Sequence, residues 1–161
     1  MTNSTANRIK AFSLTLLVIA FDRLTKAQAL KNLKLFESVK VIGNFVRFTL
    51  AKNPGGAFGT RIGNNYVYII AAIVAGALLI IWLFEKKSSI AHAAAIAVIL
   101  GGAIGNLWDR IKYGVVIDFI DVGVKNFRWP TFNVADSAIT VGIIILLVAE
   151  LFYAPKAKKA E

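Results

Sequence analysis

The residues with the clearest chemical potential are the five aspartates, Asp22, Asp109, Asp118, Asp121 and Asp136. Each follows or precedes a long apolar stretch, or lies in the polar stretch before the last one. A carboxylate at such a boundary loses solvation free energy unless it faces water, a partner charge or a protein-lined cavity. The clustering therefore predicts a polar pocket at one rim of an apolar bundle, although aspartate also favours loops and helix N-termini for local reasons.

Two carboxylates that share one proton can together catalyse the hydrolysis of a peptide bond. The ionised acid takes a proton from water while the protonated acid activates a carbonyl group, so neither a metal nor a cofactor is expected. The chain has no Cys and a single His, which excludes thiol nucleophiles and Cys/His zinc clusters. His92 enters its apolar stretch from the side opposite the aspartates, which excludes a Ser-His-Asp triad. A Ser-Lys dyad stays open, because Ser137 adjoins Asp136 and several lysines lie on the same side.

Long apolar stretches must position these acids. Hydrophobic residues make up 57% of the chain, against about 45–50% in an ordinary soluble domain. Residues 66–84 and 90–108 are runs of 19 residues without a formal charge, and such a helix is about 28 Å long, close to the bilayer core of about 30 Å. Residues 136–153 form a third candidate, in which Glu150 lies near enough to the end to reach the head groups.

The first apolar stretch, residues 11–21, is shorter and has two interpretations. It is a retained helix, or it is the apolar region of a signal peptide cut after Ala27-Gln28-Ala29. Asp22, Arg23 and Lys26 make the stretch before that triplet too charged for a cleavage region, which favours the helix. We therefore expect a mainly α-helical membrane protein, one domain over residues 1–161, with four transmembrane helices at about 9–30, 66–84, 90–108 and 136–153.

Charge does not settle the orientation of these spans. Four spans place the N-terminus, residues 85–89 and the C-terminal tail on one side, and residues 22–65 and 109–135 on the other. Of the 19 Lys and Arg residues, seven fall on the first side and twelve on the second, but the seven are concentrated in short segments. The net charge of +10 suits anionic lipid head groups, and no nucleic-acid-binding motif accompanies it, so no nucleic-acid partner is expected.

The segment at about 32–65 is too long for a simple turn. Residues 38–50 alternate and are rich in Val, Ile, Phe and Thr, which predicts short strands with a break near Gly43 and Asn44. Residues 53–59 then combine Asn53 with Gly55 and Gly56, which permit unusual backbone angles. We expect a small β-rich extracytoplasmic segment between the first two helices.

Two residue spacings in and just after the apolar stretch at 90–108 predict how that helix packs and where its polar face lies. Gly101 and Gly105 are four residues apart, a spacing that lets another helix approach closely. Asn106, Asp109 and Arg110 share one helical face through their i, i+3 and i+4 spacing. An Asp and an Arg this close are also compatible with a simple salt bridge.

Five sequence blocks resemble those of one family. The blocks DRLTK (22–26), KNPGGAFG (52–59), GGAIGNLWDR (101–110), VIDFID (116–121) and FNVADSAI (132–139) are similar, in the same order, to those of lipoprotein signal peptidase, also called signal peptidase II. They extend from the first span to the last. Two departures are visible: Arg23 stands where the family often has Gln, and Pro54-Gly55-Gly56 replaces the more usual x-Gly-Ala.

The resemblance implies a bacterial inner-membrane aspartic endopeptidase. Such an enzyme removes the signal peptide from diacylglyceryl-modified prolipoproteins by cutting N-terminal to the lipidated cysteine. It implies cytoplasmic N- and C-termini, a site near the extracytoplasmic interface, and contact with membrane lipids; a monomer is expected. The catalytic residues would be Asp118 and Asp136, and the supporting or substrate-binding residues would be Asn53, Gly56, Asn106, Asp109, Arg110, Asn133, Asp22 and Lys26.

Two other functions compete with this hypothesis. A proton-coupled transporter also uses intramembrane acids, but usually near the midplane and often in repeated halves, neither of which the sequence indicates. A non-enzymatic four-helix assembly factor is the third possibility.

The peptidase hypothesis makes three structural predictions. The carboxyl groups of Asp118 and Asp136 should lie within about 3–6 Å of each other or of one shared water. Arg110 should hold the loop carboxylates and the substrate backbone. The loop at 53–59, including Phe58, should lie over the lipid-bearing cysteine.

Overall fold

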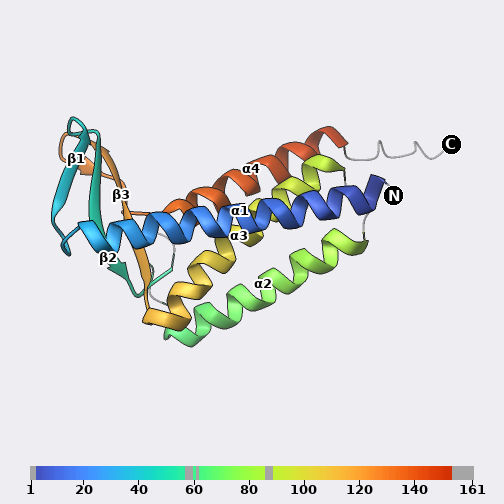
Figure 1. The fold of residues 1–161 in the computed structure, drawn as a ribbon, viewed down its shortest axis with the longest axis horizontal. Helices are drawn as coiled ribbons and strands as arrows, with labels where there is room; N and C mark the ends of the chain where they lie inside the picture. Colours follow the sequence, from blue (N-terminus) through green and yellow to red (C-terminus); the bar gives the residue numbers. More distant parts are fainter. Residues whose placement is uncertain (1–2, 57–59, 61, 86–88, 154–161) are drawn as a thin grey trace.

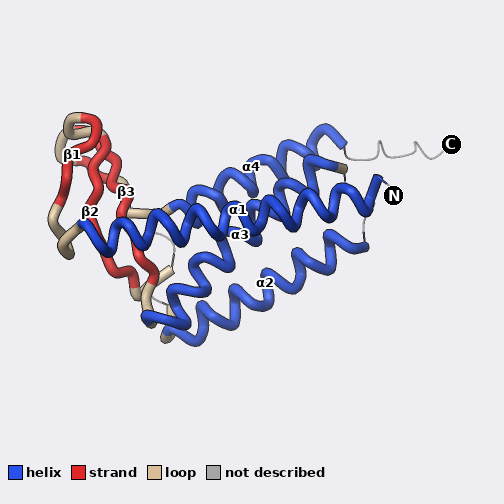
Figure 2. Tube along the Cα trace, in the orientation of Figure 1, coloured by secondary structure: helices blue, strands red, loops and turns tan. Residues whose placement is uncertain are grey.

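The chain forms a helical bundle with a small sheet at one end (Figures 1 and 2). A computed structural model describes residues 3–56, 60, 62–85 and 89–153. In chain order the elements are α1 (Asn3–Asn32), β1 (Ser38–Ile42), β2 (Val46–Asn53), α2 (Asn65–Glu85), α3 (Ile90–Tyr113), β3 (Val116–Val124), β4 (Phe127–Arg128) and α4 (Val134–Tyr153). The start of α1 and the end of α4 lie at the end of the bundle opposite the sheet (Figure 1).

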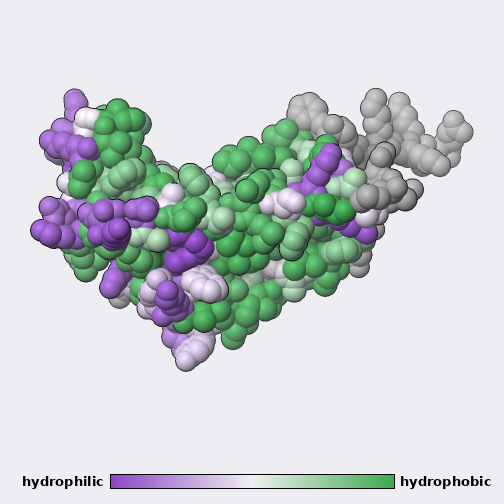
Figure 3. All heavy atoms as spheres, viewed as in Figure 1, coloured by the Kyte–Doolittle hydropathy of each residue, from purple (hydrophilic) through white to green (hydrophobic). Residues whose placement is uncertain are grey.

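Three helices have the length and composition needed to cross a membrane. Among the described residues these candidate spans are Asn65–Phe84, Ile90–Tyr113 and Val134–Leu151, which contain or closely match the predicted spans at 66–84, 90–108 and 136–153. Helix α3 packs against each of the other three helices, whereas α2 packs mainly on α3. The outer surface of the bundle is largely apolar (Figure 3), as a lipid-facing surface should be.

Residues 11–21 lie in helix α1, which continues without a break from Asn3 to Asn32, as the helix interpretation predicts. It is not among the candidate spans found by length and composition. Its charged turn is nonetheless directed inward, since Asp22 and Lys26 are fully buried. The outward face of α1 stays apolar, with Phe12 and Phe21 exposed.

Glycines allow α1 to lie close against α3, as the spacing of Gly101 and Gly105 predicts. A Cβ atom at Gly101 would lie 2.6 Å from the Cβ of Val18, and one at Gly105 would lie 2.5 Å from Oδ2 of Asp22. Neither distance is possible between real atoms, so both positions need glycine for this approach. Gly114 ends α3 in the left-handed conformation, with φ of 72°, and its N–H donates to the carbonyl of Arg110.

The sheet is larger than predicted and draws on two parts of the chain. Its four strands are antiparallel in the order β1-β2-β3-β4. Strands β1 and β2 confirm the strands expected in residues 38–50, with Gly43 in the turn at φ of 51°. The β-rich segment between α1 and α2 is confirmed, and two strands that were not predicted extend it: β2 pairs with β3 from the α3–α4 connection, placing Ala51 opposite Asp118.

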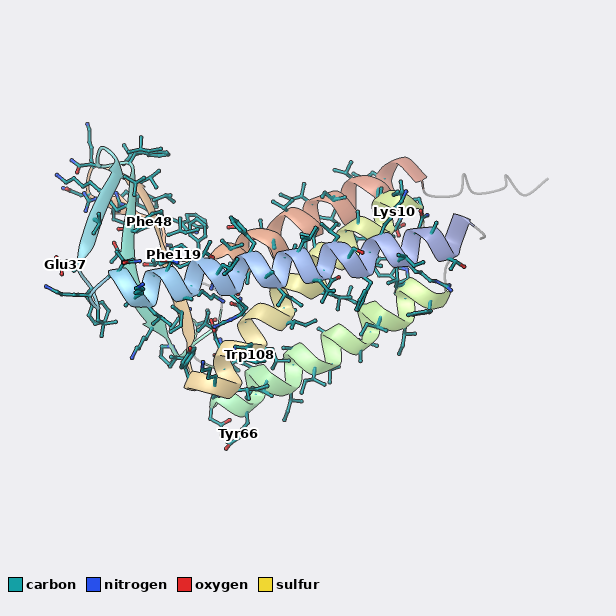
Figure 4. The ribbon with its side chains drawn as sticks, in the orientation of Figure 1. Lys10, Glu37, Phe48, Tyr66, Trp108 and Phe119 are labelled. Atoms are coloured by element: carbon teal, nitrogen blue, oxygen red, sulfur yellow. The ribbon has the colours of Figure 1, made fainter. Side chains whose placement is uncertain are left out.

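An apolar layer fixes the sheet to the bundle. Ala29 near the end of α1 packs with Leu50 of β2 and with Ile117 and Phe119 of β3, all buried. The ring of Phe48 meets that of Phe119 edge to face, with centroids 5.9 Å apart (Figure 4). Because β3 is held on α1 in this way, the position of Asp118 is set by the bundle as well as by the sheet.

Candidate active site

Asp118 and Asp136 reach one site from two different elements. Asp118 lies in β3, and Asp136 lies in the first turn of α4. The fully buried Asn133 joins them: its Nδ2 donates to Oδ1 of Asp118 at 2.7 Å, and its backbone N–H donates to Oδ2 of Asp136 at 3.2 Å. One residue therefore hydrogen-bonds both carboxyl groups, and the predicted separation of about 3–6 Å between them stays a prediction.

Asn106 of α3 supplies a second amide to the pair. Its Nδ2 donates to Oδ1 of Asp136 at 2.8 Å. Its Oδ1 accepts from Nζ of Lys26 at 2.9 Å and from Nδ2 of Asn133 at 3.1 Å. The two amides and the two acids thus form one connected hydrogen-bond network, to which Lys26 contributes a positive charge.

The environment of Asp118 favours its protonated form. Asp118 is only 2% exposed. Burial, together with the negative charge of Asp136, raises the pKa of Asp118 from 3.8 to about 7. Hydrogen bonds from Asn53 and Asn133 and the charge of Lys26 oppose this shift without cancelling it. Near neutral pH, Asp118 is therefore able to supply a proton.

Asp118 and Asp136 line one large cavity. Its volume is about 900 Å³, within the range of small-molecule sites. Both aspartates line it, as do polar groups of α3 and of the segment after β2; apolar walls come from α4 and from residues 129–132. The lining includes six of the predicted catalytic or supporting residues: Asn53, Gly56, Asn106, Arg110, Asp118 and Asp136.

Arg110 lies at this cavity but not on the carboxylates. Its guanidinium donates to the carbonyl of Gly55 and to Oδ1 of Asn65, the latter at 3.3 Å. It also lies 4.4 Å above the centre of the Tyr68 ring. Within the described residues no hydrogen bond joins it to Asp118 or Asp136. The structure therefore assigns it to the segment after β2, which differs from the expectation that it would hold the loop carboxylates.

Two of the five aspartates line the polar cavity, and the other three face partner charges instead. Asp22 and Asp109 are fully buried behind the cavity, where both contact Lys26. Asp121 points elsewhere and pairs with Arg128, with 2.7 Å between Oδ1 and Nη2. The difference arises because β3 alternates its faces, so positions 118 and 121 cannot point into the same space.

The alternative nucleophile arrangements gain no support from the geometry. Ser137 lines the cavity, but its hydroxyl donates to the carbonyl of Asn133 at 3.0 Å, and within the described residues no lysine contacts it. His92 lies at the other end of α3, where its ring contacts Ser89 and Glu150. It is remote from the aspartates, as the sequence indicates.

Several cavity residues were not predicted. Tyr68 of α2 carries no signal beyond being an aromatic residue in an apolar span. Asn65, directly before that span, does not line the cavity but hydrogen-bonds Arg110, which does; it is a polar residue that a search for helix-terminal amides would have found. Trp129 and its neighbours follow the motif at 116–121 and could be anticipated only by knowing that the chain turns back to the site there.

The fold and the site together define a membrane-embedded peptidase of the aspartic class. Comparison with known proteins makes this assignment specific. The family model described as "Signal peptidase (SPase) II" matches residues 14–152. The chain therefore belongs to the signal peptidase II family and has the function of a lipoprotein signal peptidase, an aspartic endopeptidase.

Relatives support the family assignment over nearly the whole chain. A lipoprotein signal peptidase of Pseudomonas aeruginosa is 40% identical over 154 residues, covering 91% of this chain and 90% of the relative. One from Syntrophotalea carbinolica is 41% identical over 139 residues, covering 83% and 86%.

A solved structure confirms the architecture. The structure described as "Bacterial membrane enzyme structure by the in meso method at 2.3 A resolution" superposes with a TM-score of 0.85 at 30% identity. The match covers 94% of this chain and 93% of that one. The fold is thus that of a multi-pass bacterial membrane enzyme.

Proposed function

We propose that this enzyme removes the signal peptide from diacylglyceryl-modified prolipoproteins, cutting N-terminal to the lipidated cysteine, with Asp118 and Asp136 as its catalytic pair. The observation that carries the proposal is the bridging role of Asn133, which hydrogen-bonds both carboxylates at the wall of one cavity. A single water between two such acids is held for attack on a peptide carbonyl, and neither a metal nor a covalent intermediate is needed.

The two acids have different roles in this mechanism. Asp136, which accepts hydrogen bonds from Asn106 and from the Asn133 backbone, is the ionised base that takes a proton from the attacking water. Asp118, with its raised pKa, is the acid that gives a proton to the carbonyl oxygen. When the tetrahedral intermediate collapses, the proton on Asp136 passes to the leaving amine, and Asp118 recovers its proton from the hydroxyl that becomes the new carboxyl group.

The apolar cavity walls suit a lipidated substrate. Residues Ile139 and Val141 of α4 and Phe132 before it line the same cavity as the acids. Each buried CH₂ of an acyl chain contributes about 0.8 kcal/mol, so two acyl chains can supply much of the binding free energy and of the positioning. Gly56 also lines the cavity, whereas Phe58, which was expected to lie over the lipid, is outside the described residues.

The arrangement of the bundle supports a defined orientation. The acids lie at the sheet end, and the start of α1 and the end of α4 lie at the other end (Figure 1). This suits cytoplasmic termini and a site near the extracytoplasmic interface, with the membrane lipids around the bundle. It also disfavours the transporter hypothesis, since a proton relay would need acids near the middle of the bundle. The proposal further includes a monomer without a nucleic-acid partner.

The test is cleavage of one precursor in two forms, with and without its diacylglyceryl group, by the purified enzyme in the same detergent. Mass spectrometry of the products identifies the bond that is cut. We expect a product that begins at the lipidated cysteine and very poor cleavage of the unlipidated form. Equal rates for both forms at saturating substrate would show that the site recognises the peptide alone.

A variant links this lipid dependence to the cavity wall. A Cβ atom at Gly56 would lie 3.0 Å from Cε1 of Tyr68 and 3.1 Å from Oγ1 of Thr60, so a larger side chain must displace the wall. Gly56→Gln should therefore lower kcat/KM for the lipidated precursor strongly, with a smaller effect on the unfolding temperature. Unchanged KM and kcat in Gly56→Gln would show that this segment is not part of the substrate site.

A further inference from the structure

Behind the cavity lies a buried charge cluster that does not itself contact the cavity. Lys26 of α1 is fully buried, and its Nζ contacts three oxygens: Oδ2 of Asp22 at 2.9 Å, Oδ2 of Asp109 at 2.8 Å and Oδ1 of Asn106 at 2.9 Å. Arg23 also contacts Asp109. The cluster contains two negative and two positive side chains, so it is balanced without any contribution from Asp118 or Asp136.

The contact with Asn106 is chemically directional. A lysine ammonium has three donors and no acceptor, so the atom of the Asn106 amide that faces it must be the oxygen. The nitrogen of the same amide then faces Asp136, to which it donates at 2.8 Å. In the opposite orientation the amide NH₂ would face the ammonium, and the amide oxygen would face a carboxylate oxygen. Both contacts would be repulsive.

We propose that Lys26 is a positioning residue for catalysis: by fixing the orientation of the Asn106 amide, it keeps a hydrogen-bond donor on the carboxylate of Asp136. Lys26 does not touch the reacting atoms in this scheme and acts only through Asn106. The proposal rests on the proposed catalytic role of Asp136 and extends it to the bundle interior.

The remaining contacts of the cluster hold Lys26 in place. Oδ1 of Asp22 accepts the backbone N–H of Ala135 at 3.0 Å, which ties α1 to the first turn of α4, one residue before Asp136. Oδ2 of Asp109 accepts the N–H of Ile117 at 3.2 Å, one residue before Asp118. The two carboxylates that fix Lys26 are thus themselves bonded to the backbones of the two segments that carry the catalytic pair.

A simple Lys26 substitution is a poor test, since it would leave the Asp22 carboxylate buried without its cation, a change that by itself destabilises the fold strongly. The double variant Lys26→Met/Asp22→Asn is charge-balanced. Asp109 keeps Arg23, and Asn at position 22 keeps an oxygen for the Ala135 N–H. The matched control is Arg23→Gln, which removes one charge from the same cluster and leaves the Lys26–Asn106 bond intact.

The experiment measures kcat, KM and thermal unfolding for these variants with the lipidated precursor. We expect the double variant to unfold as a single cooperative transition and to bind substrate with little change in KM, but with kcat lowered about 10- to 100-fold, the cost of one hydrogen bond to a charged group. Arg23→Gln should keep kcat within about threefold of the wild type. A folded double variant with wild-type kcat would overturn the proposal.

A double-mutant cycle distinguishes action through Asn106 from general structural support. If Lys26 acts only through that amide, adding Asn106→Ala to the double variant should cause far less further loss of kcat than Asn106→Ala causes in the wild type. Fully additive losses would overturn the positioning role even if both aspartates prove essential. Retained activity in Asp136→Asn would instead overturn the proposed catalytic role of Asp136. The two results therefore distinguish failure of the positioning role of Lys26 from failure of the proposed function.

Discussion

Asn133 and Asp136 hydrogen-bond each other in both directions. Oδ1 of Asn133 accepts the backbone N–H of Asp136 at 2.9 Å, and Oδ2 of Asp136 accepts the backbone N–H of Asn133 at 3.2 Å. This is the reciprocal geometry of a capping box, with Asn133 at the N-cap of α4 and Asp136 three residues later. The capping box that begins α4 therefore also orients the carboxylate of Asp136, a proposed catalytic group. The N-cap residue is Asn133, not Asp136.

Substitutions at Asn133 can separate capping from catalysis. Asn133→Ser keeps an oxygen for the cap but loses the Nδ2 donor to Asp118, so we expect near-normal thermal stability with kcat lowered about 10- to 100-fold. Asn133→Ala should lose a similar amount of activity and, in addition, about 1 kcal/mol of stability. Thermal unfolding and kcat, measured on both variants, check this; a Ser variant with wild-type kcat would refute the bridging role.

Gly105 should be intolerant of any side chain. Since its Cβ would lie 2.5 Å from Oδ2 of Asp22, Gly105→Ala must displace that carboxylate from Lys26, and we expect a loss of about 1–3 kcal/mol of stability. Gly76 on α2 provides a matched control, because a Cβ there meets only Leu100 at an ordinary 3.8 Å. Gly76→Ala should leave the unfolding temperature unchanged or higher; equal effects of the two substitutions would be inconsistent with this packing.

The contribution of Arg110 to activity should depend on the geometry of its guanidinium more than on its positive charge. The guanidinium donates to Gly55 and Asn65 at once and lies over Tyr68, and a lysine cannot reproduce this fork. We expect Arg110→Lys to lose activity nearly as severely as Arg110→Ala, about tenfold or more in kcat/KM. Steady-state kinetics on the lipidated precursor test the comparison, and full activity in the Lys variant would show that only a positive charge is needed.

The raised pKa of Asp118 predicts a pH-dependent stability. Between its unfolded value of 3.8 and its folded value of about 7, the unfolded chain has lost a proton that the folded chain still holds, so stability falls as the pH rises through this window. Asp118→Asn carries no such proton. Its stability relative to the wild type should therefore increase from pH 4 to pH 7, by about 1–4 kcal/mol, and level off above. Unfolding temperatures at several pH values check this; a constant difference would mean that the pKa is not raised.

Hydrophobic runs were sufficient to predict most of the helical architecture. Runs such as 66–84 fit a bilayer by length alone, and the alternation in 38–50 predicts short strands with a break near Gly43 and Asn44. Strand β3 was missed because Asp118 and Asp121 interrupt its apolar pattern and because its partner, β2, lies far away along the chain. Long-range pairing of this kind leaves no local signal in a single sequence.

The site was predictable in its residue types but not in its connections. The resemblance pointed to Asp118 and Asp136, and the structure places both at one cavity. It could not show that Asn133 bridges them or that Arg110 binds the segment after β2, because these contacts depend on how α2, α3, α4 and the sheet come together. Tyr68 has no distinguishing signal at all, since aromatic residues are common in membrane spans.

The most direct test of the central claim is the turnover of the lipidated precursor by Asp118→Asn, Asp136→Asn and the control Asp121→Asn, each purified and shown to be folded. Asp121 lies on the same strand as Asp118, but it pairs with Arg128 and does not line the cavity. We predict that the first two variants lose about a thousandfold or more in kcat while still binding substrate, and that Asp121→Asn stays within about threefold of the wild type. Substantial turnover by Asp118→Asn or by Asp136→Asn would contradict the two-aspartate mechanism.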